Sequence, residues 1–350
     1  MPRQYQINTE TKLLLYTSKT FLNKQELTLI ISLLRQSINW KVFLQLANHH
    51  RCSALVYNAF SNLKESSHRD VNIPNYIWEG LRNYYYQSLA KSFRLWQIFI
   101  KIKDAFNQSS IPCIPLKGII LARTVYPNPA LRPVLADIDI LIEESKLAIA
   151  KNKLEAMGFK FLKKESHVLL FKKEWSLLEL HTRILPQWVN RVDMKLLWAR
   201  AQRIDIEGSK ILTLSPEDTL LSLSLQLRND WPYFHLFRLC DINEIITKYS
   251  QFLDWQYLAK TAQQFGIKGT LYFYLQLCQS LLASPLPMDW NKIIKPRLFW
   301  RYILNKLLEK NINQLFSSFL QPMMTRRESQ FLKITMNDYI WDSLKIFLHR

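Results

Sequence analysis

The 350-residue sequence predicts an α+β fold in which a small mixed sheet is flanked by N- and C-terminal helical regions. Apolar residues recur every three or four positions in residues 1–110, as on the buried face of a helix. Short apolar runs separated by charged turns fill residues 111–185 and indicate strands. From residue 186 the helical spacing returns. We therefore expect three regions, namely 1–110, 111–185 and 186–350, with a basic, aromatic-rich segment after about residue 291.

The N-terminal region carries three amphipathic stretches that predict helices. Proline cannot continue a helix, so Pro74 separates the second stretch from the third. The stretches are NKQELTLIISLLRQ (23–36), NWKVFLQLANHHRCSALVYNAFSNL (39–63) and YIWEGLRNYYYQSLAKSFRLWQIFIKIKDAFNQS (76–109).

The central region predicts strands and short helices in alternation. Gly118 opens a short helix that Pro127 and Pro129 close. Ser145 is a predicted N-cap for the next helix, and Gly158 fits the position just past its end. In chain order we expect a strand at 111–116, a helix at 118–126, a strand at 136–144, a helix at 146–157, and strands at 159–162, 167–173 and 176–184.

The C-terminal region predicts helices throughout. Ser215 as N-cap, Pro216 at the first helical position and acidic residues in the first turn form a strong start signal. Further helical stretches are FRLCDINEIITKY (237–249), WQYLAKTAQQF (255–265) and TLYFYLQLCQSLL (270–282).

Composition limits the classes of protein. Forty-seven Lys and Arg against twenty-eight Asp and Glu give a net charge of +19, which favours polyanionic partners such as RNA or else an evenly basic surface. Six glycines form neither a dinucleotide fingerprint nor a P-loop, and the four scattered cysteines form no CxxC pair. With no apolar run long enough to span a membrane, we expect a cytoplasmic protein with free thiols.

Two aspartates in one predicted strand raise the question of function. Asp137 and Asp139 alternate with Ile138 and Ile140, so both carboxylates lie on one face of the strand. Such a pair is unfavourable without a cation, and it offers oxygen ligands to one or two Mg²⁺ ions. The simpler alternative is a solvated acidic edge strand.

Further polar residues complete the candidate site. Glu179 is the obvious third carboxylate, and strand alternation places His181 on its face. Lys117 and Gly118 lie where a strand becomes a helix and could hold phosphate oxygens. The alternatives are a cross-strand ion pair for Glu179, a structural role for His181 and a solvated strand end for Lys117.

The linked motifs resemble a known family. They are Leu-Lys-Gly (116–118), Tyr-Pro-x-Pro-x-x-Arg-Pro (126–133), Asp-Ile-Asp-Ile-Leu (137–141), Glu-Leu-His (179–181) and Leu-x-Asp-Ile (239–242). Together they resemble the uncharacterised bacterial nucleotidyltransferases of the DNA polymerase beta-like superfamily. The resemblance extends from about residue 25 to about residue 285.

The resemblance implies an enzyme with a nucleotidyltransferase core that transfers an NMP group from an NTP such as ATP to an acceptor, by a two-metal in-line mechanism. Asp137, Asp139 and Glu179 would be the catalytic carboxylates and the ligands of Mg²⁺, with Mn²⁺ as an alternative ion. Lys117, Gly118, Arg132 and His181 would contact the nucleotide. Arg132 could instead hold its loop by bonding backbone carbonyls, and Asp241 is expected to be structural or to line the pocket.

Two other functions stay open at the level of sequence. One is a nucleotide-binding module with weak or no turnover. The other is a basic helical protein that binds a partner or a membrane surface through the segment after residue 291. The acceptor of an active enzyme could be RNA, including tRNA, a protein or a small molecule.

Overall fold

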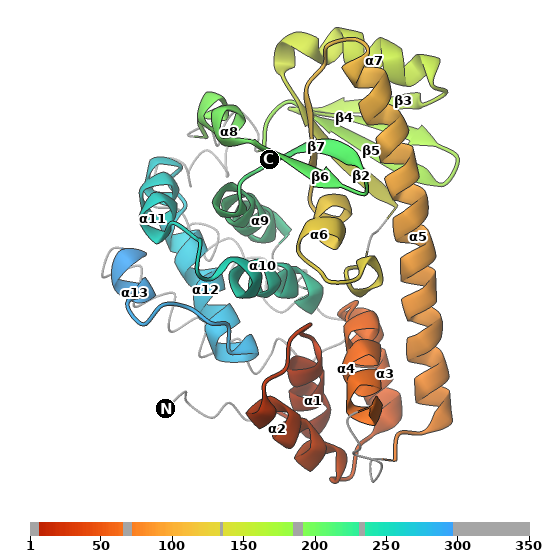
Figure 1. The fold of residues 1–350 in the computed structure, drawn as a ribbon, viewed down its shortest axis with the longest axis vertical. Coiled ribbons are helices and arrows are strands. Elements are labelled where there is room, and N and C mark those ends of the chain that lie inside the picture. The colour runs from red at the N-terminus through yellow and green to blue at the C-terminus, as the bar shows by residue number, and fades with distance from the viewer. Residues whose placement is uncertain (1–6, 66–71, 134–135, 185–191, 231–234, 297–350) are drawn as a thin grey trace.

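The computed structural model describes residues 7–65, 72–133, 136–184, 192–230 and 235–296 (Figure 1). It confirms the α+β fold, with a mixed sheet between helical regions. The N-terminal helices begin at asparagine caps: Asn8, Asn23 and Asn39 each accept a hydrogen bond from a backbone N–H of the first turn. The helices are α1 (Thr9–Thr17), α2 (Lys24–Leu34), α3 (Trp40–His49), α4 (Ser53–Glu65) and α5 (Asn75–Asn107).

The sheet has five strands in the order β1-β2-β5-β4-β3. It is mixed because β2 and β5 run parallel while the other neighbours are antiparallel. The strands are β1 (Cys113–Leu116), β2 (Asp137–Ile142), β3 (Lys160–Glu165), β4 (Val168–Lys173) and β5 (Ser176–His181). Strand β2 lies inside the sheet, between β1 and β5, so the edge-strand interpretation of its aspartates is wrong.

Short helical elements connect these strands. They are α6 (Gly118–Thr124), η1 (Pro129–Leu131), η2 (Glu144–Lys146) and α7 (Leu147–Ala156). Gly158 follows α7 with a φ of 84°, as predicted for a helix end. The predicted N-cap at Ser145 is wrong, because Ser145 lies inside the 3-10 turn η2 and α7 begins two residues later.

The C-terminal region corrects the expectation of helix throughout. Residues 202–213 form a hairpin of two antiparallel strands, with a turn at Glu207 and Gly208 in which both residues have positive φ. The elements are α8 (Met194–Arg200), β6 (Gln202–Ile206), β7 (Ser209–Thr213), α9 (Pro216–Asp230), α10 (Leu236–Tyr249), α11 (Trp255–Gln264), α12 (Lys268–Leu282) and α13 (Trp290–Ile293). Ser215 caps α9 as predicted, since its Oγ accepts from the N–H of Asp218 at 3.2 Å.

Two hydrophobic cores lie on the two faces of the sheet. One face carries Ile138 and Ile140 and packs with the second half of α5, with α7 and with the hairpin β6–β7. The larger core joins the N-terminal helices to α9–α12. Helix α5 belongs to both, through Ile77 at its start and Phe99 further along, and it runs beside both parts in Figure 1. Alternation along β2 therefore turns its aspartates away from the core under α5.

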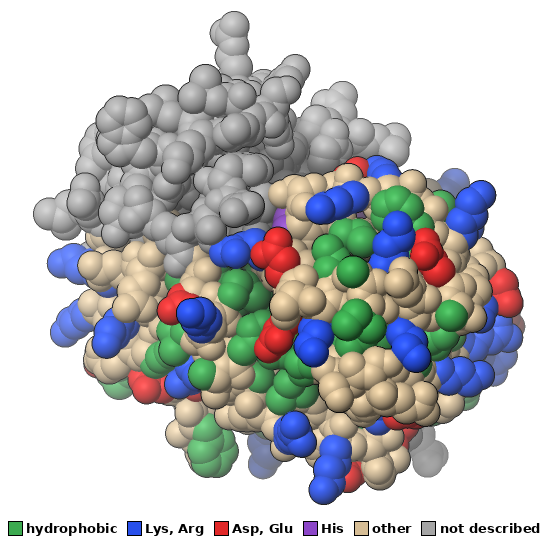
Figure 2. All heavy atoms as spheres, turned by 90° about the horizontal axis from the view of Figure 1, so that it is seen from above, with side chains coloured by type: hydrophobic (Ala, Val, Ile, Leu, Met, Phe, Trp, Pro, Cys, Tyr) green, Lys and Arg blue, Asp and Glu red, His purple; other side chains and the backbone are tan. Residues whose placement is uncertain are grey.

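The surface charge is dispersed on the face seen in Figure 2. Lysine and arginine side chains lie among acidic and hydrophobic ones there rather than in a single patch. The four cysteines are buried and free, as expected. None of the described helices combines the length and the apolar character needed to cross a bilayer.

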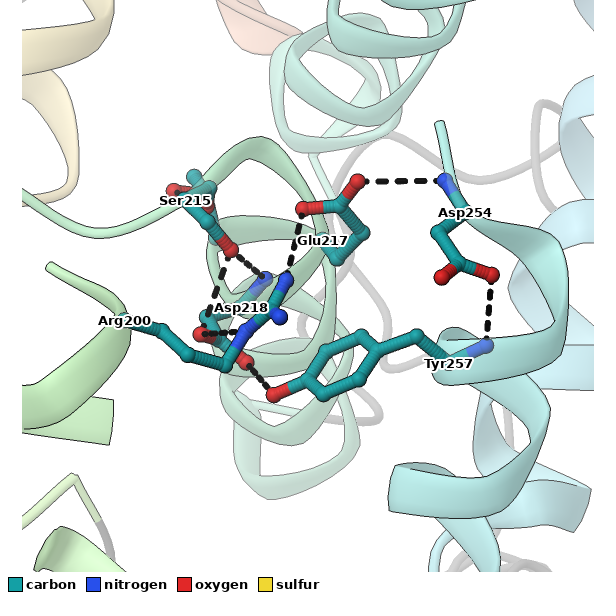
Figure 3. A network of polar contacts seen from close by, with 7 residues as sticks. Arg200, Ser215, Glu217, Asp218, Asp254 and Tyr257 are labelled. Carbon is teal, nitrogen blue, oxygen red and sulfur yellow. Dashed lines mark hydrogen bonds and ion pairs between the residues drawn. The ribbon is translucent and has the colours of Figure 1, made fainter. Parts of the chain in front are cut away.

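A polar network fixes the start of α9 against its neighbours (Figure 3). Asp218 is fully buried and accepts hydrogen bonds from the hydroxyl of Tyr257 at 2.7 Å and from the hydroxyl of Ser215 at 3.1 Å. The Arg200 guanidinium lies 3.5 Å from Asp218 and 3.4 Å from Glu217, and it stacks over the Tyr257 ring. This network links α8, α9 and α11.

Candidate functional site

Strand pairing brings Asp139 and Glu179 together. They are register partners in the parallel pair β2–β5, so both side chains stand on the same face of the sheet at the same level. The side chain of Asp139 is 3% exposed, whereas that of Glu179 is 33% exposed. Two carboxylates this close, one of them buried, require a positive partner.

In the protein without a bound ligand, the ammonium group of Lys117 is the positive partner of these carboxylates. Its ammonium group contacts Oδ1 of Asp139 and lies 3.5 Å from Oε2 of Glu179. Burial lowers the pKa of Lys117, but the charges of Asp139 and Glu179 outweigh burial, so the pKa is raised and the amine stays protonated. Lys117 is therefore an ion-pair partner in the site and not a solvated strand end.

The backbone of Lys117 is strained. Its φ of 57° and ψ of −132° lie in a region that favours glycine, at the turn from β1 into α6. Such a conformation costs about 1–3 kcal/mol and persists only where the surroundings enforce it. Leu116 is the register partner of Asp139, so the turn places the next residue directly beside the carboxylates.

His181 completes the contacts of the two carboxylates. Its Nε2 lies 3.0 Å from Asp139 and 3.2 Å from Glu179, so Nε2–H is the shared donor. Burial lowers the pKa of His181, but these hydrogen bonds outweigh it and raise the pKa. Burial also raises the pKa of Asp139, but the Lys117 charge and the His181 hydrogen bond reverse that shift, so Asp139 stays ionised.

Asp137 lies beside this cluster rather than inside it. It lines the same cavity as Asp139 and Lys117, two residues along the same strand face. Burial, and next the neighbouring charge of Asp139, raise the pKa of Asp137. The structure thus brings Asp139, Glu179, His181 and Lys117 into contact, with Asp137 on the adjoining wall.

Arg132 belongs to a buried structural pair. Its guanidinium makes a two-pronged contact with Asp241, with Nη2 at 2.7 Å and Nε at 3.1 Å from the carboxylate oxygens. It also donates to the backbone oxygen of Pro133, and the Tyr126 hydroxyl donates to Asp241 at 2.8 Å. A Cβ on Gly118 would lie 2.0 Å from Arg132 Nη1, so only glycine fits there. Arg132 thus sets the shape of the cavity wall that it shares with Gly118.

The donor set suits a divalent cation with oxygen ligands. The ligand atoms of Asp139, Glu179 and His181 lie within 4.8 Å of one another. His181 uses Nε2–H as a donor, so the oxygens of Asp139 and Glu179 are the ligands on offer, with Asp137 close by. The Lys117 ammonium already contacts both carboxylates, so a cation would compete with that amine for them.

Three arginines surround Phe237 next to the acidic cluster. The guanidinium carbons of Arg132, Arg51 and Arg238 lie 5.1, 5.6 and 5.5 Å from the centre of that ring. Burial lowers the pKa of Arg51, and Asp137 is among the charges that act on it. Arg51 comes from the loop between α3 and α4, which the sequence alone does not place near β2. The family resemblance, which begins near residue 25, covers Arg51 without assigning it a role.

Gln226 is a second residue that sequence reasoning missed. It lies on α9 in the wall of the same cavity. Its carboxamide oxygen is buried and has no hydrogen-bond partner among the residues that the structure describes. A buried acceptor without a partner is unfavourable, so this oxygen is available to a donor group of a ligand.

Several solved structures resemble part of this chain. No curated protein matches it. The solution structure of the antibiotic-resistance factor ANT(2'')-Ia is 14% identical with a TM-score of 0.37 and covers 45% of this chain and 85% of its own. The crystal structure of ANT(2'')-Ia in complex with adenylyl-2''-tobramycin is 13% identical, with a TM-score of 0.38. The match covers 49% of this chain and 97% of that chain. The crystal structure of an antigenic nucleotidyltransferase-like protein from Paracoccidioides brasiliensis is 16% identical, with a TM-score of 0.38. The match covers 56% of this chain and 94% of that chain.

The family comparison agrees with the motifs of the centre. A model of a family described as uncharacterised nucleotidyltransferase matches residues 36–283. The match includes the sheet, α6, the loop that bears Arg51 and the helices that bear Gln226 and Asp241. The chain belongs to this family of uncharacterised nucleotidyltransferases, and the protein is a transferase.

Proposed function

We propose that the protein transfers NMP from an NTP to an acceptor hydroxyl, with Mg²⁺ held at the Asp139–Glu179 pair. The observation that carries the proposal is the register of β2 against β5, which sets these two carboxylates side by side. Their nearest cation is Lys117. A pair of acids served by a single flexible amine suits a site that exchanges one cation for another.

Asp137, Asp139 and Glu179 are the proposed metal ligands. A divalent ion at these oxygens would neutralise phosphate charge and lower the pKa of the attacking hydroxyl. Glu179 is the proposed proton acceptor, because its side chain is 33% exposed and that of Asp139 is 3% exposed. His181 is a positioning residue, since its Nε2–H donates to both carboxylates and holds them in place.

The proposed phosphate contacts come from the basic side of the cavity. Lys117 has a long, flexible stem, so its ammonium can leave the carboxylates for phosphate oxygens when a metal binds. Arg51 is a further proposed phosphate ligand, because its guanidinium makes no ion pair within the described part of the chain and lies near Asp137. Gly118 keeps the wall open. A direct contact of Arg132 with nucleotide stays a prediction, since that guanidinium is engaged by Asp241.

Metal-dependent nucleotide binding tests the proposal. Calorimetric titrations with each of the four NTPs, with Mg²⁺ or with EDTA, are made on the protein and on Asp137→Asn, Asp139→Asn, Glu179→Gln and Arg51→Met variants. Asp104→Asn on the exposed face of α5 is the matched control. We expect Mg²⁺-dependent binding that each site variant weakens by about tenfold or more and the control leaves unchanged. NTP binding that ignores both metal and the carboxylates would refute the site.

A further inference from the structure

A second cavity adjoins the candidate site. It has a volume of about 190 Å³ and shares Lys117 and Leu223 with the cavity that contains Asp137 and Asp139. Its walls come from α6, the hairpin β6–β7, α9 and α10, which are neighbours in Figure 1. Lys117 lines this cavity and also contacts Asp139, so only the Lys117 side chain separates the cavity from that proposed metal ligand.

The lining of this cavity is nearly free of charge. Among the residues that the structure describes, Lys117 is the one charged residue in the lining, no carboxylate lines it, and much of the wall is aliphatic. Several threonines line it too, but their hydroxyl protons are taken. Thr124, Thr213 and Thr219 donate to backbone oxygens at 2.9, 3.3 and 2.8 Å. These side chains therefore offer a ligand only methyl surface and oxygen lone pairs.

We propose that this cavity holds the body of the acceptor, and that the acceptor is a small uncharged molecule with hydroxyl or amide N–H donors and one apolar face. The inference rests on the proposed function. Aliphatic walls take the apolar face, and the threonine oxygens accept from the donors. One acceptor hydroxyl extends past Lys117 to the carboxylates.

The transfer step follows from this placement. The acceptor oxygen forms a bond to the α-phosphorus of the NTP, and the bond from that phosphorus to the bridging oxygen of the β-phosphate breaks. Pyrophosphate leaves with the electron pair of the broken bond, and the hydroxyl proton passes to Glu179. The products are the nucleotidylated acceptor and pyrophosphate.

The same lining disfavours other acceptor classes. A polycationic molecule would meet the Lys117 ammonium and no carboxylate, so desolvating its charges would be uncompensated. A polynucleotide as a whole exceeds a 190 Å³ cavity, and the face in Figure 2 shows no single basic patch among its coloured residues that would hold a phosphate backbone.

The experiment compares acceptor fractions and cavity variants. A small-metabolite extract is separated by ion exchange into neutral, anionic and cationic fractions, and each is incubated with the protein, Mg²⁺ and the four α-labelled NTPs. RNA and protein fractions are run in parallel. Ser222→Leu adds bulk to the cavity wall, and Thr219→Val keeps the volume but removes one oxygen acceptor. Ser32→Leu on the exposed face of α2 is the control for the first variant.

We expect label in the neutral fraction only. Ser222→Leu should lower that labelling by about tenfold or more while NTP affinity stays within about twofold, and Ser32→Leu should change neither. Thr219→Val should raise the KM for the neutral acceptor with NTP affinity unchanged. Because Thr219→Val is close in shape, it tests the cavity even if Ser222→Leu fails to fold.

Other results would overturn the inference. Label on cationic or anionic compounds, RNA or protein would assign a different acceptor. Loss of NTP affinity in Ser222→Leu would assign the cavity to the donor nucleotide instead. A protein that binds Mg²⁺-NTP but labels no fraction contradicts this inference alone. A protein that binds no NTP contradicts the proposed function as well.

Discussion

Lys117 shows how much of this site depends on one side chain. Its ammonium contacts the two carboxylates that are proposed to bind a metal. Its backbone has a positive φ, which a lysine adopts only where the surrounding structure enforces it. The Leu-Lys-Gly motif in the sequence predicts that Lys117 contacts phosphate oxygens. It could not show the contact with Asp139, because that contact depends on how the turn after β1 is folded against β2.

Replacing Lys117 by Met should destabilise the protein, because Asp139 and Glu179 lose their ammonium partner and keep only the hydrogen bonds from His181. We expect the free energy of unfolding to fall by roughly 2–4 kcal/mol, less than for a fully buried pair because Glu179 is one third exposed. Added Mg²⁺ should restore part of the loss, since the carboxylates no longer have a competing amine. Urea unfolding with and without Mg²⁺ measures both effects.

The control for this variant is Lys172→Met, an exposed lysine on β4. It should leave both the stability and its response to Mg²⁺ unchanged. If Lys117→Met were as stable as the unmodified protein and equally indifferent to Mg²⁺, the ion pairs of Lys117 would contribute nothing.

His50 should make the stability depend on pH. Burial, and next the charges of His49 and His235, lower its pKa to about 3, and its Nδ1 accepts from the N–H of Leu236. The unfolded chain binds a proton near pH 6.5 and the folded chain does not until about pH 3. The free energy of unfolding should therefore fall as the pH drops below 6.5, by about 2 kcal/mol between pH 7.5 and pH 5.

The measurement is urea unfolding across that pH range for the protein and for His50→Asn, which keeps an acceptor for Leu236 but does not titrate. The variant should lose the part of the slope that His50 contributes, while His167, whose pKa burial lowers to about 4, should still contribute its own part. His49→Asn, at the exposed neighbour, should keep most of it. Equal slopes in all three proteins would show that His50 is not the group responsible.

At the scale of elements, the sequence predicts the sheet well and the hairpin not at all. Alternation in residues 137–142 and 176–181 identifies β2 and β5, because one face must meet the core. The order of the strands does not follow from the sequence. Strand β5 pairs directly with β2 in the sheet, although β3 and β4 lie between them in the chain. The signal for β6–β7 was present in the alternating RIDI and the Glu-Gly turn, but the helical stretches on either side obscured it.

The network at the start of α9 should contribute to stability as a unit. Tyr257→Phe removes the hydroxyl that donates to the fully buried Asp218. We expect a loss of about 1.5–3 kcal/mol in the free energy of unfolding, because a buried carboxylate loses a hydrogen bond. Tyr76→Phe, at a tyrosine that is 54% exposed, should change stability little. Thermal and urea unfolding of the two variants test the difference; similar losses in both would argue against the network.

At the scale of the molecule, the N- and C-terminal helical regions share one core, and the site lies where that core meets the sheet. Arg51, Gln226 and Asp241 reach the site from outside the predicted central region, so residues 111–185 alone do not make it. The three-region division remains a proposal. The basic segment after residue 291, which offered an alternative function, lies almost wholly outside the described residues. The net charge of +19 favours anionic ligands without indicating their size.

The most direct test of the central claim is label transfer from α-labelled NTPs in the presence of Mg²⁺. The protein, Asp139→Asn and the surface control Asp104→Asn are each offered RNA, proteins and small metabolites. Label should pass to one acceptor class with the protein and the control, and roughly a hundredfold more slowly with Asp139→Asn. Equal transfer by Asp139→Asn would show that the carboxylate pair of β2 and β5 is not the catalytic site.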